Sequence, residues 1–202
     1  MATTIFLVRH AAHDRVDRVL CGRMPGVGLG DTGRWQAEAL AEWFAGKAPA
    51  AVDAVWTSPL DRARETAQPI ADRLGLLALD SDALREIDFG DWTGRAFDEL
   101  RDDPRWRRWN EARTGERPPG GETMAEAQSR AMAEVERARE EHPGRGVVLV
   151  SHGDVIKAIL AGVLGLPLDA HARFEVSPAS ISVLAVWRGG GRVLRMNGTV
   201  AE

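Results

Sequence analysis

The chain has 202 residues, of which 44% are hydrophobic and 28% are charged, a balance typical of a globular domain with a sizeable core. Its formal net charge of −4 argues against a nucleic-acid-binding surface, which requires clustered positive charge. The single cysteine, Cys21, excludes an internal disulfide. The short apolar run near the N-terminus does not resemble a signal peptide, and no stretch approaches the roughly 18 apolar residues of a membrane span. We therefore expect a cytoplasmic protein.

The first part of the chain alternates between expected strands and helices. Ile5 to Val8 is an unbroken apolar run, typical of a strand that is buried on both faces. A glycine-rich loop over 21–33 leads into a helix from Thr32 to about Lys47, with Asp31 or Thr32 as its N-cap. A second strand is expected over 54–57.

A second helix is expected to begin at Ser58. The sequence there combines a capping serine, a proline at the first helical position and Asp61 at the third. Gly75 is expected to end this helix after Leu74, and a third strand over 76–79 follows.

The second part of the chain contains the strongest break in the sequence, Pro118 to Gly121, which we interpret as a loop rather than a domain boundary. An acidic loop over 84–94 and short helical pieces over 95–112 precede it. The later elements are a helix with one apolar face, a strand, another helix and a closing hairpin, over 124–138, 146–150, 154–164, 181–187 and 192–196. This alternation predicts a single α/β domain over residues 1–202, a three-layer α/β/α sandwich with a mainly parallel central sheet.

Two histidines come after apolar strands, His10 after the first and His152 after the strand over 146–150. Ligands of parallel α/β sheets bind beyond the carboxyl ends of the strands, so two parallel strands would bring both histidines to the same edge. A small residue follows each histidine, Ala11 and Gly153, and permits close approach of backbone or ligand. This repeated pattern favours a functional site over two unrelated surface or core histidines.

Arg62 lies near the start of the second expected helix, where the partial positive charge of the helix end makes an arginine locally unfavourable. Such a conflict often marks a functional site. Free backbone N–H groups beside a guanidinium would suit a phosphate. The alternative is an exposed arginine paired with Glu65 or Asp61, a description that fits Arg64 better.

The loop over 84–94 offers three candidate proton donors, Glu86, Asp88 and Asp91, among apolar neighbours. A carboxyl group in apolar surroundings can have a raised pKa, which suits proton donation near neutral pH. The residues alone do not choose among the three, and an ordinary solvated loop is the alternative.

In this order, these segments resemble the histidine phosphatase superfamily, also called the phosphoglycerate mutase-like family, over nearly the whole chain. Arg9-His10-Ala11 is similar to the Arg-His-Gly signature of the family, with Ala11 in place of the usual glycine. The second arginine motif, the acid motif, the helix-opening segment and the second histidine motif match at 57–67, 84–94, 118–123 and 150–153. A lone Arg-His pair would mean little, whereas five motifs in the correct order are highly specific.

The resemblance implies a role for each matching residue. His10 would be the nucleophile that carries the phosphoryl group, and Glu86 the general acid and base. The groups that bind the phosphoryl group would be Arg9, Arg62, His152 and Gly153. This clamp would stabilise the charge on the equatorial oxygens, so neither a divalent metal nor another cofactor is expected, and the expected partner is a small phosphorylated metabolite.

The chain departs from the family pattern in the loop after the first histidine. That loop commonly carries a threonine and, further on, an asparagine near the phosphate, and the asparagine is missing here. His13 either replaces a phosphate contact or is exposed. Cys21, Gly22 and Arg23 fall where relatives contact the substrate, and Arg23 either binds a second anionic group or is solvated. Lys157 lies one turn into the helix after His152, and the sequence does not decide whether it faces solvent.

Three other functions compete with phosphomonoester hydrolysis as interpretations of this sequence. A phosphomutase is less favoured because the cofactor-dependent mutases of the family are generally longer, with inserted segments that close over the substrate. A catalytically inactive binding protein on the same fold is disfavoured because every expected catalytic position is filled. A dinucleotide-binding domain would need Gly-x-Gly-x-x-Gly after the first strand, and this chain lacks it. A monomer or a homodimer is expected, since an edge strand near the C-terminus could pair or stay covered.

Overall fold

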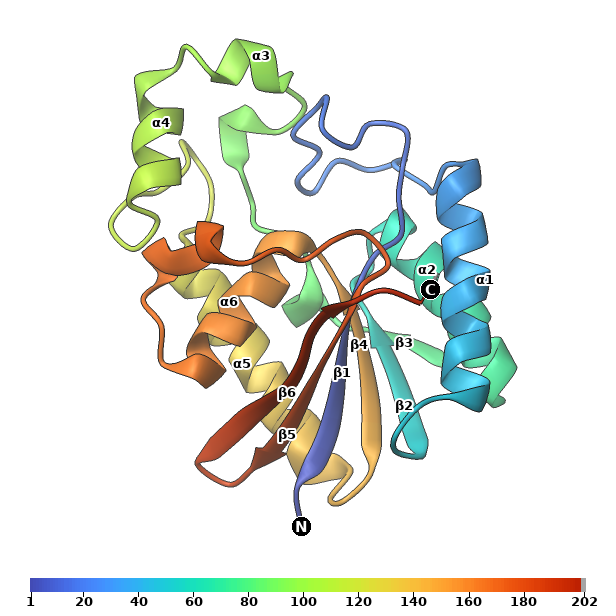
Figure 1. Cartoon of the computed structure of the whole chain (residues 1–202). Coiled ribbons are helices and arrows are strands. Elements are labelled where there is room, and N and C mark those ends of the chain that lie inside the picture. The colour runs from blue at the N-terminus through green and yellow to red at the C-terminus, as the bar shows by residue number, and fades with distance from the viewer. Residues whose placement is uncertain (201–202) are drawn as a thin grey trace.

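The computed structural model describes residues 1–200. Its centre is a six-stranded sheet with the strand order β3-β2-β4-β1-β5-β6 (Figure 1). The strands are β1 Thr3–Arg9, β2 Val52–Thr57, β3 Ala78–Asp80, β4 Gly146–Ser151, β5 Ile181–Trp187 and β6 Gly190–Gly198. The first four are parallel, whereas β5 is antiparallel to both β1 and β6. The mainly parallel central sheet predicted from the sequence is confirmed.

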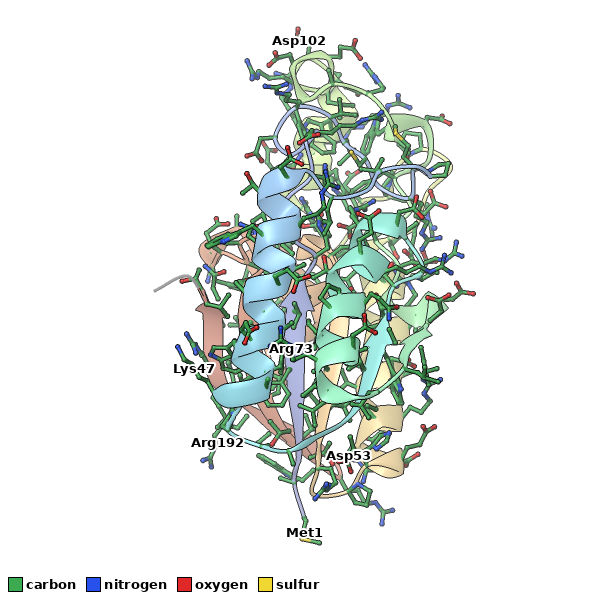
Figure 2. All side chains as sticks on the ribbon, turned by 90° about the vertical axis from the view of Figure 1, so that its right-hand side faces the viewer. Met1, Lys47, Asp53, Arg73, Asp102 and Arg192 are labelled. Carbon is green, nitrogen blue, oxygen red and sulfur yellow. The ribbon has the colours of Figure 1, made fainter. Side chains whose placement is uncertain are left out.

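Helices cover both faces of this sheet. On one face, α1 (Asp31–Gly46) packs against α2 (Asp61–Leu74), and Figure 2 shows this pair in front of the sheet. On the other face, α5 (Met124–Glu141) packs against α6 (Gly153–Leu164). The three-layer α/β/α arrangement is therefore confirmed. Within residues 1–200, no helix combines the length and the apolar character that a bilayer crossing needs.

The central strands divide their side chains between two apolar cores. Phe6 and Val8 of β1 join the core beneath α1 and α2, and Ile5 and Leu7 join the core beneath α5 and α6. Neighbouring strand residues point to opposite faces, so a strand covered by helices on both sides must be apolar throughout. This physical requirement explains why Ile5 to Val8 carries no alternating pattern.

The structure corrects two expected helix starts. The N-cap of α1 is Gly30 rather than Asp31 or Thr32. The N-cap of α2 is Leu60, so the serine at 58 is not a capping residue, and its hydroxyl serves another purpose described below. The end of α2 is as predicted, with Gly75 in the left-handed conformation at φ +68°.

The segment between β3 and α5 forms a hood, residues 90–116, beyond the carboxyl ends of the parallel strands (Figure 1). It contains a 3₁₀ turn (Gly90–Trp92), α3 (Phe97–Leu100) and α4 (Pro104–Glu111); a separate 3₁₀ turn (Asp82–Leu84) precedes it and another (Leu168–Arg173) follows α6. In Figure 2, Asp102 of the hood lies at the opposite end of the molecule from Met1.

Tryptophans hold the hood together. The rings of Trp92 and Trp106 meet edge to face at 5.3 Å between centroids, and Trp109 is fully buried beside them. Edge-to-face pairs are a favoured geometry of aromatic side chains and add to the effect of apolar burial. At the base of the hood, Gly90 adopts φ +51° and a Cβ there would lie 2.0 Å from the Pro119 carbonyl oxygen, so only glycine fits.

Candidate active site

The two histidines meet at the carboxyl edge of the sheet. The register between β1 and β4 pairs Arg9 with Ser151, which places the following residues, His10 and His152, side by side. Their ring centroids are 5.0 Å apart, and the side chains are almost wholly buried, at 3% and 0% relative exposure. The structure therefore brings these two predicted residues together, as the parallel pairing of their strands requires.

Hydrogen bonds hold the two rings in opposite tautomers. Nδ1 of His10 lies 2.9 Å from the Ala11 carbonyl oxygen, which can only accept, so this nitrogen carries the proton and Nε2 keeps its lone pair. Nδ1 of His152 lies 3.2 Å from an Nη2 of Arg62, which can only donate, so here Nδ1 accepts and Nε2 carries the proton. Nε2 of His152 donates to Ser58 Oγ at 2.8 Å.

Burial keeps both rings neutral. Burial lowers the pKa of His10 well below its ordinary value, and the positive charges of Arg62 and Arg9 lower it further. The pKa of His152 is lowered for the same reasons, with burial again the largest cause. A neutral imidazole that carries a lone pair on Nε2 can act as a nucleophile, which a protonated ring cannot.

Arg62 is the centre of the site. Its side chain is 2% exposed, and it extends from the first turn of α2 toward both histidines. Nε donates to His10 Nε2 at 3.3 Å, and Nη2 donates to the Gly22 carbonyl oxygen at 2.7 Å. Nη1 is buried without a hydrogen-bond partner among residues 1–200. An unsatisfied buried guanidinium N–H is costly, and an anion in the pocket would satisfy it.

Arg9 supplies a second cation. Its Nη1 donates to the Val176 carbonyl oxygen at 2.6 Å, while its Nε, like Arg62 Nη1, is buried and has no partner in the described part of the chain. Gly153 packs directly on this guanidinium, since a Cβ there would lie 3.4 Å from Arg9 Cζ. The glycine after the second histidine therefore leaves room for the arginine before the first.

Glu86 faces the same pocket. Burial raises the pKa of Glu86 to about 7, and the negative charge of Asp154 acts in the same direction. Two effects oppose this rise in pKa. Glu86 Oε1 accepts a hydrogen bond from the N–H of Ile87 at 2.9 Å, and the positive charges of Arg62 and Arg9 favour the ionised carboxylate. The other two candidate acids of this loop are placed differently. Asp88 accepts from the N–H of Gly90 at 2.9 Å and forms an ion pair with Arg23 at 3.5 Å, and Asp91 is exposed to solvent.

These groups line one pocket with a volume of about 200 Å³. Its polar floor comprises Arg9, His10, Arg62, Glu86 and Gly153. Its outer wall combines apolar side chains, among them Val16, Val19, Leu20, Phe97 and Val176, with charged ones such as Asp17 and Glu175. Lys157 also lines this wall with a side chain only 14% exposed, and its Nζ lies 3.9 Å from Glu175. The sequence left open whether Lys157 faces solvent, and in the structure its side chain is mostly buried.

The start of α2 differs from the expected phosphate cradle. The N–H of Arg62 donates to the Val27 carbonyl oxygen at 3.1 Å, so it is not free for a ligand. Glu65 and Asp61 accept from the N–H groups of Leu29 and Gly26, and these bonds fix the loop before α1. The guanidinium of Arg62 therefore faces the pocket without either acid as partner, and Arg64 is the exposed arginine, paired with Asp80.

The Cys21-Gly22-Arg23 segment supports the site in three different ways. Cys21 lines the pocket, and burial raises the pKa of its thiol. Gly22 holds Arg62 through its carbonyl oxygen and adopts φ +47°, a conformation that favours glycine. Arg23 points away from the pocket lining: Nε donates to the Glu86 carbonyl oxygen at 2.8 Å and Nη2 to Glu122 at 2.9 Å. These contacts join Arg23 to the Glu86 loop, and the two roles that the sequence leaves open for it, a second anion site or a solvated side chain, stay predictions.

His13 lies at the mouth of the site. Its ring centroid is 5.5 Å from that of His10, and it lines the same pocket. Its Nδ1 accepts from the N–H of Arg15 at 3.3 Å, which leaves the proton on Nε2. Burial, together with Arg62 and Arg9, lowers the pKa of His13 to about 4, so the neutral ring offers one N–H donor.

Three residues at or beside the pocket were not predicted from the sequence as part of the site. Ser58, expected as a helix cap, instead accepts from His152. Asp154 and Arg113 form an ion pair of 2.9 Å at the pocket wall, with Arg113 buried. The one available signal was an acidic residue directly after the Ser-His-Gly motif, and no sequence pattern pairs it with an arginine 41 positions earlier.

Clusters of three or more histidine, cysteine, aspartate or glutamate side chains that could hold a metal are absent from the described residues. The donors that converge on the pocket floor are guanidinium and imidazole groups. Such a donor set suits an anion with several oxygens rather than a divalent cation.

Known proteins resemble the chain over most or almost all of its length. The model of the histidine phosphatase superfamily (branch 1) matches residues 5–199. Phosphoserine phosphatase 1 of Hydrogenobacter thermophilus is 30% identical over 198 residues, which are 96% of this chain and 91% of that protein. A probable phosphoglycerate mutase of Yersinia pestis, GpmB, is 33% identical over 152 residues, 72% of this chain and 71% of that protein.

A solved structure has the same fold. The mycobacterial glucosyl-3-phosphoglycerate phosphatase superposes with a TM-score of 0.86 at 29% sequence identity, covering 98% of this chain and 100% of that one. The order of motifs, the geometry of the pocket and these similarities agree, and the chain belongs to the histidine phosphatase superfamily.

Proposed function

We propose that this protein hydrolyses phosphomonoesters of small metabolites through a phosphohistidine on His10, without a metal ion. The observation that carries the proposal is the pairing of a neutral His10, whose Nε2 keeps its lone pair, with buried guanidinium donors of Arg62 and Arg9 that lack partners among residues 1–200. The similarity to two phosphatases, one named for phosphoserine and one for glucosyl-3-phosphoglycerate, supports hydrolysis of a small phosphorylated substrate.

In the proposed first step, His10 Nε2 attacks phosphorus while Glu86 gives its proton to the departing alkoxide. Arg62 Nη1 and Arg9 Nε bind the equatorial phosphoryl oxygens, where negative charge is spread in the transition state. The N–H of His13 is placed to give a further hydrogen bond to the phosphate. A carboxyl group with a pKa of about 7 can donate a proton at neutral pH and take one up again.

In the proposed second step, Glu86 accepts a proton from water, which attacks the phosphohistidine and releases inorganic phosphate. Splitting one difficult displacement into two steps is the advantage of a covalent intermediate. The same group changes from acid to base, so a single carboxyl serves both steps.

The test is hydrolysis of p-nitrophenyl phosphate in EDTA by the wild type, His10→Ala and the matched variant His142→Ala. His142 follows α5 and lies against Trp56, and its carbonyl oxygen accepts from the Thr3 hydroxyl at the start of β1, the end of that strand opposite the pocket. We expect wild type and His142→Ala to be active in EDTA and His10→Ala to be inactive. Activity in His10→Ala would show that His10 is not the nucleophile, and activity that EDTA abolishes would contradict the metal-free route.

A phosphomutase is the second candidate, favoured by the similarity to GpmB. The two activities differ in the acceptor of the phosphoryl group, water or a second hydroxyl. ³²P-labelled protein separates them: release as inorganic phosphate on dilution into buffer indicates hydrolysis, and transfer only when 3-phosphoglycerate is added indicates a mutase.

We further propose a cytoplasmic enzyme that is a monomer or a homodimer. The single cysteine is consistent with a reducing compartment. Light scattering coupled to gel filtration measures the oligomeric state, and cell fractionation measures the location.

A further inference from the structure

A negative charge stands where the proposed function calls for binding an anion. Asp154 is the second residue of α6, close after His152, and it lines the same pocket as Glu86 and Arg9. Its side chain is 22% exposed. A carboxylate in the first turn of a helix interacts favourably with the helix dipole, but it repels a phosphate dianion. Its presence in this pocket therefore needs an explanation beyond helix stability.

Arg113 neutralises part of this charge from the far side of the pocket wall. Its Nη1 lies 2.9 Å from Asp154 Oδ1, and the side chain is 7% exposed. Nη2 donates to Asn110 Oδ1 at 3.0 Å, and the guanidinium stacks over Trp109 with 5.1 Å between Cζ and the ring centroid. Arg113 is thus held by the hood on one side and by the start of α6 on the other.

A second contact joins the same two parts of the molecule. The N–H of Thr114 donates to Asp169 Oδ1 at 2.8 Å, and Asp169 is an exposed residue outside the pocket lining. The hood is therefore attached to the region around α6 through two carboxylates, of which only Asp154 faces Glu86 in the pocket.

We propose that Asp154 and Arg113 are positioning residues for the reaction: Asp154 keeps Glu86 protonated for donation to the leaving group, and Arg113 limits how strongly Asp154 does so. This inference rests on the proposed role of Glu86. It makes the hood part of the acid–base machinery, because the hood carries the cation that balances Asp154.

The charges around both carboxylates agree with this arrangement. The negative charge of Asp154 is the second largest cause, after burial, of the raised pKa of Glu86. Asp154 itself has a lowered pKa because Arg113, His171 and Lys157 outweigh its burial, so it is the partner that stays ionised. The other charged groups nearest Glu86 are Arg62 and Arg9 in the pocket and Arg23 and Arg130 at its carbonyl oxygen. His10, His13, Asp17, Lys157 and Glu175 also line the pocket.

The test is the pH dependence of kcat/KM for an alkyl phosphate, whose poor leaving group needs protonation. The activity of wild type should fall on the basic side as Glu86 loses its proton. In Asp154→Asn we expect this basic limb to move to lower pH by about one unit, the typical effect of one nearby charge. In Arg113→Met the uncompensated Asp154 should move it to higher pH.

Opposite shifts distinguish this role from loose packing of the hood, which would change the rate without a signed shift. The matched control is Asp169→Ala, which removes the other hood contact and a negative charge outside the pocket; its basic limb should stay in place. A basic limb that does not move in Asp154→Asn, or that moves the same way in both pocket variants, overturns the proposal.

The variant Glu86→Gln separates this inference from the proposed function. If its profile still shows the wild-type basic limb, Glu86 is not the acid and the proposed function loses that assignment. If Glu86→Gln removes the limb while Asp154→Asn leaves it unmoved, Glu86 remains the acid and only the role of Asp154 and Arg113 fails.

Discussion

Arg62 Nε lies 3.3 Å from His10 Nε2, so the arginine that would bind phosphate also donates to the nitrogen that would attack it. Attack requires the lone pair that this hydrogen bond occupies. An incoming phosphate oxygen is charged and accepts more strongly than a neutral imidazole nitrogen, so it can draw the N–H away. In the proposed mechanism, substrate binding would thereby free His10 Nε2 for attack, while the hydrogen bonds of the ring to Arg62 and Ala11 fix the tautomer that attack requires.

Arg62→Lys should damage the enzyme although the charge is kept. Lysine cannot reproduce the fork that reaches His10, the Gly22 carbonyl oxygen and His152 at once. We expect kcat/KM for p-nitrophenyl phosphate to fall on the order of 10²- to 10³-fold. Arg64→Lys, on the exposed side of the same helix, should change it little. Equal activity of the two variants would contradict the assignment of Arg62.

Ser58→Ala should reduce activity through His152. The serine hydroxyl accepts the Nε2 proton of His152 at 2.8 Å, and without it a buried N–H loses its partner and the ring is free to turn. The cost of such an unsatisfied donor predicts a loss of about tenfold or more in kcat/KM. Ser81→Ala is the matched control, because Ser81 is also buried and its hydroxyl caps no helix. A loss of the same size in Ser81→Ala would assign the effect to packing.

The sequence predicted the parts of the site that strands deliver. His10 and His152 meet because both follow buried parallel strands, and β1 and β4 are paired in register up to Arg9 and Ser151. Hydrophobic pattern and strand order are enough for that inference. The predicted start of α2 was wrong because Ser58, followed by a proline and Asp61, mimics a helix cap. In the structure, the Ser58 hydroxyl instead accepts a hydrogen bond from His152 across the sheet edge.

Contacts between side chains from distant loops could not be predicted from the sequence. Arg23 reaches Glu122, and Arg113 reaches Asp154, across separations that no helix or strand period sets. An arginine in a loop has many possible carboxylate partners, and only the packing of the hood on the sheet decides among them. For this reason the sequence did not predict that Arg23 contacts Glu122 and the Glu86 carbonyl oxygen.

Glu122→Gln should loosen the loop that carries Glu86. The Glu122 carboxylate accepts from Arg130 Nε at 2.7 Å and from Arg23 Nη2 at 2.9 Å, and both arginines also donate to the Glu86 carbonyl oxygen. Removing the charge leaves two guanidinium groups close together with weaker compensation. We expect the free energy of unfolding in urea to fall by about 1–3 kcal/mol.

The matched control for this variant is Glu42→Gln, which breaks an exposed pair with Arg73. Surface pairs contribute about 0–1 kcal/mol, so its unfolding curve should nearly overlay that of wild type. If both variants lose the same stability, the contacts of Glu122 have no special role in holding the Glu86 loop.

Stability should fall as the pH drops from 7.5 to 5.5. The pKa values of His10 and His152 lie below 6.5 in the folded protein, so unfolding takes up protons in this range, and the stability present above pH 6.5 is lost as the pH falls. Glu86 acts oppositely, because its pKa of about 7 exceeds the unfolded value of 4.5 and its proton favours the folded state at lower pH. His13, whose pKa is lowered to about 4, adds to this loss. The three histidines together outweigh one carboxyl, and each group contributes at most about 1.4 kcal/mol per pH unit, so we expect a net fall of about 1–3 kcal/mol in the free energy of unfolding. Denaturant titrations at the two pH values measure it; Glu86→Gln should steepen the fall and His10→Asn should reduce it, whereas constant stability in wild type would mean that the histidines are not held neutral.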